Sequence, residues 1–106
     1  MRAGQLRHRL QLQSVTITQS ASGEPTETWR TVDTIWGGLR PISQRERASV
    51  REPLADADYV VPVRYRSNLT PRMRLLLGDR TFDILGAQDP DDRNRELHLY
   101  CRERSL

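Results

Sequence analysis

Few residues in this chain have the chemistry for catalysis or metal binding, and they are far apart. The histidines are His8 and His98, and the single cysteine is Cys101. A structural zinc site needs four ligands, usually Cys and His in close pairs, and no such set is present. Nucleophile elbows, phosphate-binding glycine loops and the His spacings of nucleophilic catalysts are also missing. The sequence therefore predicts no catalytic residue, no metal ligand and no cofactor, and so not an enzyme.

Three aspartates crowd one segment near the C-terminus and raise the question of a calcium site. A calcium-binding loop of the twelve-residue type needs spaced oxygen ligands, a central glycine and a terminal glutamate. The sequence around Asp89, Asp91 and Asp92 lacks that spacing. An acidic turn held by Arg93 or Arg95 is the better interpretation.

Arginine is the most frequent charged side chain in the sequence. All 17 basic residues are arginine, the net charge is +3, and the pI is about 9.7. A GC-rich genome explains this bias, and so does a need for forked contacts with carboxylate or phosphate groups. A net charge this small does not by itself indicate nucleic-acid binding. The arginines of interest form two sets. The first, in the polar segment 43–58, is Arg45, Arg47 and Arg51. The second, in a segment where arginine alternates with apolar residues, is Arg64, Arg66, Arg72 and Arg74.

The second set alternates with apolar residues over positions 63–75. Alternation of period two is typical of half-buried strands, so we expect two strands joined by a turn at 67–71, with the arginines on one face. Like charges facing each other across a strand pair are destabilising. This face therefore requires acidic groups above it, an anionic ligand or a neighbouring chain.

The elements that must position these arginines predict a small all-β domain. A chain of 106 residues fits one domain, here 1–106. Strand patterns cover 6–19, 26–39, 59–66, a hairpin that turns at Gly78-Asp79, and 96–103. The phase of the first flips near Ser14, which indicates a β-bulge or bend. About six strands with these turns predict a β-barrel or sandwich.

Individual positions refine this expectation. Phe82 and Ile84 should point inward from the hairpin, and Leu97, Leu99 and Cys101 should point inward from the last strand. Gly37-Gly38 marks a break or bulge. Pro62 cannot donate to a ladder, so its strand should lie at an edge or carry a bulge.

Residues 43–58 stand apart as a long polar connection. Ser43 and Glu46 form a capping box, which predicts at most a short helix before Pro53. The segment has few large apolar residues to bury, so we expect a loop that is mobile in the free protein. Its arginines suit a solvated loop, a protein contact or a phosphate contact.

Nothing in the chain predicts a signal peptide or a membrane-spanning helix. The start, MRAGQLRHRL, has no apolar run of signal-peptide length, and no window approaches about 18 apolar residues. A lone cysteine suits a reducing compartment. We therefore expect a protein without a membrane partner that is found where it is made, in the cytoplasm.

Four stretches, in order and in register, resemble one family. They are GQLRHRLQLQ, WGGLRPISQRE, VRYRSNLTPRMRL and DRTFDILGAQDPDDRNRELHLYCRE. Together they are similar to the head–tail joining proteins of long-tailed bacteriophages, also called head-closure or stopper proteins, which occur in prophages and gene-transfer particles too. The likeness extends over nearly the whole chain, except that 46–58 matches only at its entry.

The resemblance implies a virion component, made in the host cytoplasm, that forms a ring of six or twelve copies. Such a ring would lie between the portal-associated adaptor and the tail terminator or tail tube protein, and would close the DNA-filled head. Arg45, Arg47 and Arg51 would face the channel and its packaged double-stranded DNA. Interface candidates are Arg64, Arg66, Arg72 and Arg74, with Asp89, Asp91, Asp92 and Glu96 as acidic counterparts on a neighbouring copy.

Two other functions are compatible with the sequence. A free-standing nucleic-acid-binding β-barrel would stack bases on exposed aromatic residues, but the tyrosines share the parity of valines expected to point inward. A different connector part, an adaptor or a tail terminator, would also be a virion protein. An adaptor is expected to be mainly helical, and long helical periodicity is lacking here.

Overall fold

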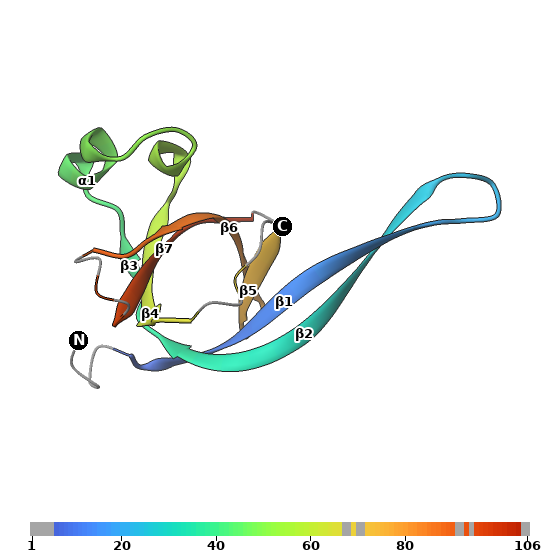
Figure 1. Cartoon of the computed structure of the whole chain (residues 1–106), viewed down its shortest axis with the longest axis horizontal. Helices are drawn as coiled ribbons and strands as arrows, with labels where there is room; N and C mark the ends of the chain where they lie inside the picture. Colours follow the sequence, from blue (N-terminus) through green and yellow to red (C-terminus); the bar gives the residue numbers. More distant parts are fainter. Residues whose placement is uncertain (1–5, 67–68, 70–71, 91–92, 94, 105–106) are drawn as a thin grey trace.

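The computed structural model describes residues 6–66, 69, 72–90, 93 and 95–104, and these form an antiparallel β-barrel (Figure 1). A two-stranded hairpin projects from one side of the barrel, and a small helical segment lies at one end. The elements, in chain order, are β1 (His8–Gln19), β2 (Pro25–Gly37), β3 (Arg40–Pro41), α1 (Gln44–Ser49), η2 (Leu54–Asp56, a 3₁₀ turn), β4 (Tyr59–Arg64), β5 (Met73–Leu77), β6 (Arg80–Gln88) and β7 (Glu96–Glu103).

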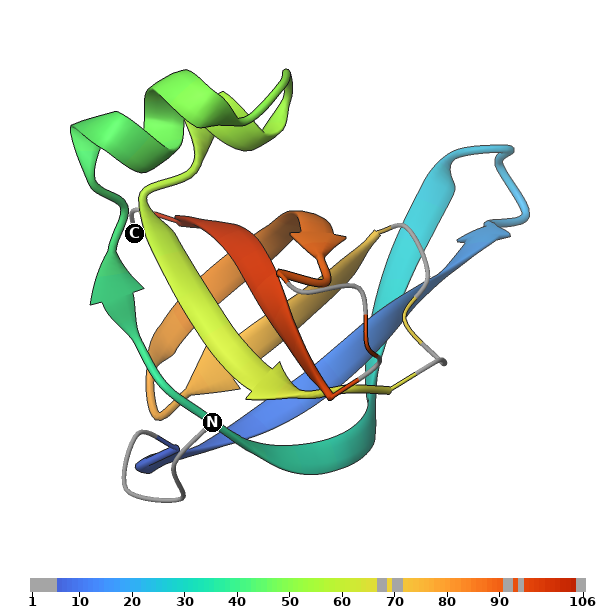
Figure 2. The same cartoon turned by 60° about the vertical axis from the view of Figure 1, so that its left-hand side comes forward.

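The strands close on themselves. Their order is β2-β1-β5-β6-β7-β4-β3, and an additional pairing of β2 with β4 joins the two sides. Figure 2 shows the strands wrapped around a common interior. Six strands thus form the closed barrel, and the two-residue β3 extends the edge of β4. The prediction of a small all-β domain with about six strands is confirmed.

The barrel closes through a single register pair, Gly37 with Val63. A Cβ atom on Gly37 would lie 2.8 Å from Leu10 Cδ1 and 3.1 Å from Val63 Cγ1. Glycine is therefore needed because the two strand backbones meet over packed core side chains. The Gly37-Gly38 pair, which the sequence predicted to be a break or bulge, lies at this closure.

The interior is filled by the residues predicted to carry the core. Phe82, Leu99 and Cys101 are fully buried, and Leu97 is nearly so. Ile84 is half-buried and packs against the same cluster. The β5–β6 turn is at Gly78-Asp79, as Leu77 pairs with Arg80, and Gly78 has a positive φ of 60°. Glycine at the first turn position fits a two-residue hairpin.

A bulge lies close to the predicted phase change of the first strand, but its extra residue belongs to the partner strand β2. The register of β1 against β2 shifts between Leu12 and Gln13, which leaves Val32 of β2 without a partner in the ladder. Leu12 and Gln13 are both buried, so the strand changes phase there. Beyond the bulge, β1 and β2 leave the barrel together. We call residues 14–31 the arm; it makes the molecule 48 Å long against 28 and 27 Å in the other directions.

Strand β4 is not a free edge strand. Pro62 lies opposite His98 of β7, and on its other side the Gly38 N–H donates to the Pro62 carbonyl at 2.9 Å. Strands β3 and β2 pair with β4 at Val60 and Val63, on either side of this proline. The missing N–H therefore coincides with an interruption in the ladder rather than with an outer edge.

The predicted hairpin over 63–75 is wrong. Strand β4 lies between β7 and the β2–β3 side, whereas β5 lies between β1 and β6. The two strands share no hydrogen-bonded pairing among the described residues. The repulsion expected between their arginines therefore does not arise, because the alternating segments belong to different parts of the barrel.

The segment 43–58 also differs from the expected loop. It begins with α1, as the capping box predicted, and continues through η2. Leu54 and Ala57 are buried and form a second core cluster with Ile42, Val60 and Tyr100. The expectation that the segment buries almost nothing is wrong, because one leucine and one alanine are enough to attach it to the barrel.

Candidate interaction surfaces

The four arginines of the alternating segments have different surroundings. Arg64 is exposed and lies opposite Glu96 in the β4–β7 register. Arg66 pairs with Asp33 of β2 at 2.5 Å, and Arg72 lies 3.4 Å from Glu27 of the arm. Arg74 donates from Nε to Gln13 Oε1 at 2.8 Å. Three of the four thus contact β1 or β2, and the expected continuous arginine face is absent.

A stack of side chains supports the base of the arm. The Arg74 guanidinium lies 4.1 Å from the centre of the Trp29 ring, and that of Arg104 lies 5.7 Å from it. Arg104 also donates from Nε to both carboxylate oxygens of Asp83, at 2.8 and 2.9 Å. Burial and the neighbouring Arg104 lower the pKa of Arg74. Cation–π contacts of this kind contribute about 0.5–2 kcal/mol, so the arm is fixed at its base.

The acidic candidates are only partly described. Asp89 is half-buried after β6 and Glu96 begins β7, whereas Asp91 and Asp92 lie outside the described residues. Glu96 Oε1 is 3.7 Å from His98 Nε2. Burial lowers the pKa of His98, and the Glu96 carboxylate opposes that shift. Within one copy, therefore, Glu96 already has two basic neighbours.

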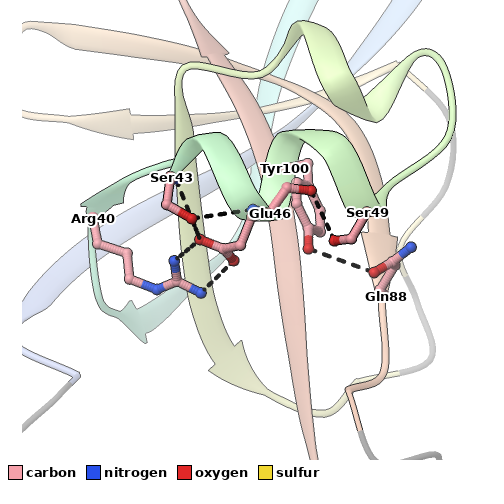
Figure 3. A network of polar contacts seen from close by, with 6 residues as sticks. All are labelled: Arg40, Ser43, Glu46, Ser49, Gln88 and Tyr100. Carbon is pink, nitrogen blue, oxygen red and sulfur yellow. Dashed lines mark hydrogen bonds and ion pairs between the residues drawn. The ribbon is translucent and has the colours of Figure 1, made fainter.

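The helical segment is held to the barrel by a polar clamp (Figure 3). Ser43 Oγ accepts from the Glu46 N–H at 3.1 Å, and the Glu46 carboxylate accepts from the Ser43 N–H at 3.4 Å. Arg40 of β3 donates two hydrogen bonds to that same carboxylate, at 2.5 and 2.9 Å. The hydrogen bonds from Arg40 are the main reason that the pKa of Glu46 is lowered. Glu46 thus joins the start of α1 to a barrel strand.

The three arginines predicted to face a channel divide into two kinds. Arg47 Nη1 donates to the carbonyl oxygens of Ala55 and Ala57, at 2.6 and 3.1 Å. This guanidinium therefore closes the helical segment on itself. Arg45 and Arg51 are exposed and have no ion pair with another described residue. These two remain available for a partner.

A groove opens where β2 and β4 diverge beyond their single pairing. It has a volume of about 210 Å³ and is lined by Ile35, Trp36, Val63, Arg64, Tyr65 and Arg66. Trp36 and Tyr65 are 52% and 39% exposed. The Arg9 guanidinium lies 5.5 Å from the Trp36 ring centre. We call this site the Trp36–Tyr65 groove.

Sequence reasoning missed this groove. The parity of β4 predicted that Tyr65 points inward with Val61 and Val63, but β4 ends at Arg64 and the alternation stops there. Trp36 is the outward neighbour of Arg9 in the β1–β2 register. The available signal was the tryptophan directly before Gly37-Gly38, at the end of β2 that closes the barrel against β4.

A larger open hollow of about 650 Å³ lies between Arg47 of α1, the start of β4 and the end of β7, and several of its charged groups are paired. Arg80 donates to both carboxylate oxygens of Glu103, at 2.8 and 2.9 Å, which raises the pKa of Arg80 and lowers that of Glu103. Asp58 accepts from the Glu103 N–H at 3.0 Å. These contacts hold the barrel end together. Across the part of the chain that is described, no group of three or more His, Cys, Asp or Glu is placed to hold a metal.

Residues 1–104 match the family of phage head completion proteins. The chain belongs to this family. It is 27% identical to head completion protein gp7 of Enterobacteria phage HK97, over 96% of each protein. The resemblance noted in the sequence is thereby confirmed, and it agrees with a virion protein. In the described ranges no helix is long and apolar enough to span a membrane.

Solved structures show the same fold. The solution structure of protein SF1141 from Shigella flexneri 2a matches with a TM-score of 0.77 and 29% identity, over 99% of this chain and 98% of that one. A chain from the virion of a native gene transfer agent particle matches with a TM-score of 0.68 and 20% identity, over 95% and 97%. The overall fold is therefore shared by both.

Proposed function

We propose that this head completion protein forms a ring of six or twelve copies that joins the filled head to the tail. The ring binds the portal-associated adaptor on one side and the tail terminator or tail tube protein on the other, and it closes the head against loss of DNA. The observation that carries this proposal is the family match over residues 1–104. The match covers nearly the whole chain.

The shape of the subunit supports an assembly role. A closed ring needs one patch on each copy that binds a different patch on the next copy. This subunit presents two structures outside the barrel core, the arm and the helical segment, at different places around the barrel (Figure 1). Arg64, Asp89 and Glu96 then contribute to contacts between copies, and Asp91 and Asp92 belong to the same acidic segment.

The helical segment supplies the contact with DNA in this proposal. Arg45 and Arg51 are exposed, so their guanidinium groups can neutralise phosphates without breaking internal hydrogen bonds. Repeated around a ring, they line the channel where the packaged DNA ends. Arg47 has a different role, since it is bonded to Ala55 and Ala57.

Removal of the gene from a phage or prophage tests this function. Particles made without the protein should separate into tails and heads that lose their DNA, and wild-type protein supplied from a plasmid should restore joined, infectious particles. Electron microscopy counts joined particles, and nuclease treatment followed by DNA quantification measures retention. Joined and infectious particles in the absence of the protein would refute the proposal.

The exposed aromatic residues of the groove favour one second candidate, a nucleic-acid-binding barrel. Stacking of bases on Trp36 and Tyr65 would give binding that weakens steeply with salt. Gel-shift of the purified protein on single- and double-stranded DNA over a salt series tests this. Binding that Trp36→Ala and Tyr65→Ala abolish together would favour the second candidate over a purely protein-binding groove.

A further inference from the structure

We infer that the arm of one copy docks into the Trp36–Tyr65 groove of the next copy, with Ile17 entering the groove and Glu24 facing Arg9 and Arg64. This inference rests on the proposed ring and names the surfaces that build it. It commits to a second copy of this chain as the occupant of the groove.

The arm does little for the fold of its own subunit. None of the residues 14–34 is buried, although all of them are described and most lie in regular strand. Ordering the backbone costs about 1–2 kcal/mol per residue, and an isolated two-stranded hairpin is marginal in water. A long arm that buries nothing is therefore expected to gain its stabilisation from another molecule.

Exposed apolar side chains mark both halves of the interface. The large hydrophobic residues exposed in the described parts of the chain are Ile17, Val32, Trp36 and Tyr65. Ile17 is on the arm, 45% exposed, and it lies opposite Glu27 in the β1–β2 register. Trp36 and Tyr65 line the groove. One patch projects and the other is a groove, so the two are different surfaces, as a heterologous contact requires.

The composition and size of the groove suit a side chain from a protein. Trp, Tyr and Arg are the residues most enriched at the energetic centres of protein interfaces. A volume of about 210 Å³ is below the roughly 300–1,000 Å³ of small-molecule sites. One branched aliphatic side chain fits a groove of this size better than a cofactor does.

The charges of the two patches are complementary. In the arm, residues 14–29 contain Glu24 and Glu27 and no arginine, and Arg30 lies at the base. Glu27 lies near Arg72 of its own copy, whereas Glu24 has no ion pair with another described residue. Around the groove, Arg66 is paired with Asp33 and Arg64 lies opposite Glu96. The Arg9 guanidinium lies beside the Trp36 ring and has no ion pair with another described residue, so the groove keeps an excess of positive charge.

The arm cannot reach its own groove. It is a continuous extension of β1 and β2, paired from His8 with Gly37 to Gln19 with Pro25, and it projects away from the barrel in both views (Figures 1 and 2). The groove lies at the other end of β2, where Trp36 approaches the barrel closure. Contact between these surfaces must therefore join two copies.

Disulfide trapping in assembled particles tests the docking. The variants carry Ile17→Cys together with either Tyr65→Cys or Thr34→Cys. Thr34 does not line the groove, but it is exposed on the same face of β2 as Trp36, two residues away. The second pair therefore leaves both aromatic residues of the groove intact. Ile17→Cys with Ser49→Cys on α1 is the matched control. The native Cys101 is fully buried and burial raises its pKa, so it does not compete. After mild oxidation, particles are analysed on non-reducing gels.

We expect a ladder of covalent multimers from the two groove variants and monomer from the control. Monomer from both groove variants, in particles that contain the protein, would overturn the docking and leave the proposed function intact. Dimers from Ile17→Cys alone would also overturn it, because they indicate arm-to-arm contact. Absence of the wild-type protein from purified particles would instead refute the proposed function, and the inference with it.

Discussion

The arm and the helical segment both leave the barrel, and both are polar in sequence, yet their packing is opposite. The helical segment returns Leu54 and Ala57 to a core cluster and is tied to β3 by Arg40 and Glu46. The arm buries none of its residues, and its contacts with the rest of the subunit lie towards its base, through Ser14, Glu27 and Trp29. The first therefore belongs to the folded subunit, and the second is available to a partner.

This difference teaches that low hydrophobicity in a segment does not show whether it is anchored. Fully burying one leucine is worth about 1.5–3 kcal/mol, enough to hold a short helical turn on a barrel end when hydrogen bonds close the rest. Fifteen or more residues of well-formed strand, by contrast, have no anchor beyond their base. What matters is where the few apolar side chains point.

The largest expected effect is from Leu54→Ala. Leu54 is 7% exposed and packs with Val60 and Tyr100. Removing its side chain leaves a cavity, so we expect a loss of about 2–5 kcal/mol in the free energy of unfolding. Urea unfolding of the purified protein measures it.

The matched control is Ile17→Ala on the arm, which should change stability by less than about 0.5 kcal/mol. Equal losses for the two variants would contradict the contrast between the helical segment and the arm.

The second prediction concerns how tightly the segment fits. A Cβ atom on Gly86 of β6 would lie 2.5 Å from Leu54 Cδ2. Gly86→Ala should therefore displace Leu54 and cost about 1–3 kcal/mol, as overpacking does. The double variant Gly86→Ala with Leu54→Ala should lose less than the sum of the two single losses, because the second change makes room for the first. Strict additivity would show that the two residues do not share this contact.

Much of the barrel could be predicted from the sequence. Alternation identified most of the strands, the glycine pair marked a special position without revealing that it is the barrel closure, and the phase change near Ser14 lies next to a bulge whose extra residue is on β2. Phe82, Leu97, Leu99 and Cys101 were placed correctly because strand parity holds inside a regular ladder. The capping box predicted the start of α1, since Ser43 and Glu46 satisfy each other's backbone amides locally.

The surfaces were harder to predict because they depend on which strands become neighbours. The segments 63–66 and 72–75 look like a hairpin, but their ladders are formed with β7, β1 and β6. Tyr65 has inward parity and yet is exposed, because it lies one residue past the end of β4. Leu54 was overlooked because its partners, Val60 and Tyr100, come from strands later in the chain.

The third prediction measures the contribution of the Arg40–Glu46 ion pair to stability, apart from the burial of Leu54. Arg40 lowers the pKa of Glu46 below 4.5 in the folded state, so the pair stabilises the protein above that pH and ceases to do so as pH falls through the folded pKa. Both side chains are partly exposed, at 43% and 25%. We therefore expect Glu46→Gln to cost only about 0.2–1 kcal/mol near pH 7.

Urea unfolding of the wild type and of Glu46→Gln at two pH values checks this sign. The difference between the two proteins should shrink as pH falls through the lowered folded-state pKa of Glu46, because below it the carboxyl is protonated in both folded and unfolded chains. Using the difference cancels the parallel titration of Asp33 and Glu103, whose pKa values are also lowered. A difference that grows as pH falls would mean that Glu46 does not act through its charge.

The smallest effect on stability is expected from Glu24→Arg at the tip of the arm. Its carboxylate has no ion pair with another described residue, and the side chain is exposed, so the free energy of unfolding should change by less than about 0.5 kcal/mol. Joined particles should nevertheless become rare in a complementation assay, because the arm then carries the same charge as Arg9 and Arg64. The variant Arg64→Glu should fail in the same way, and the two changes together should restore part of the joining, as opposite charges again face each other. Thermal melting of each variant confirms that the fold is intact. If Glu24→Arg joins heads to tails as well as the wild type does, the tip of the arm does not contact a basic surface.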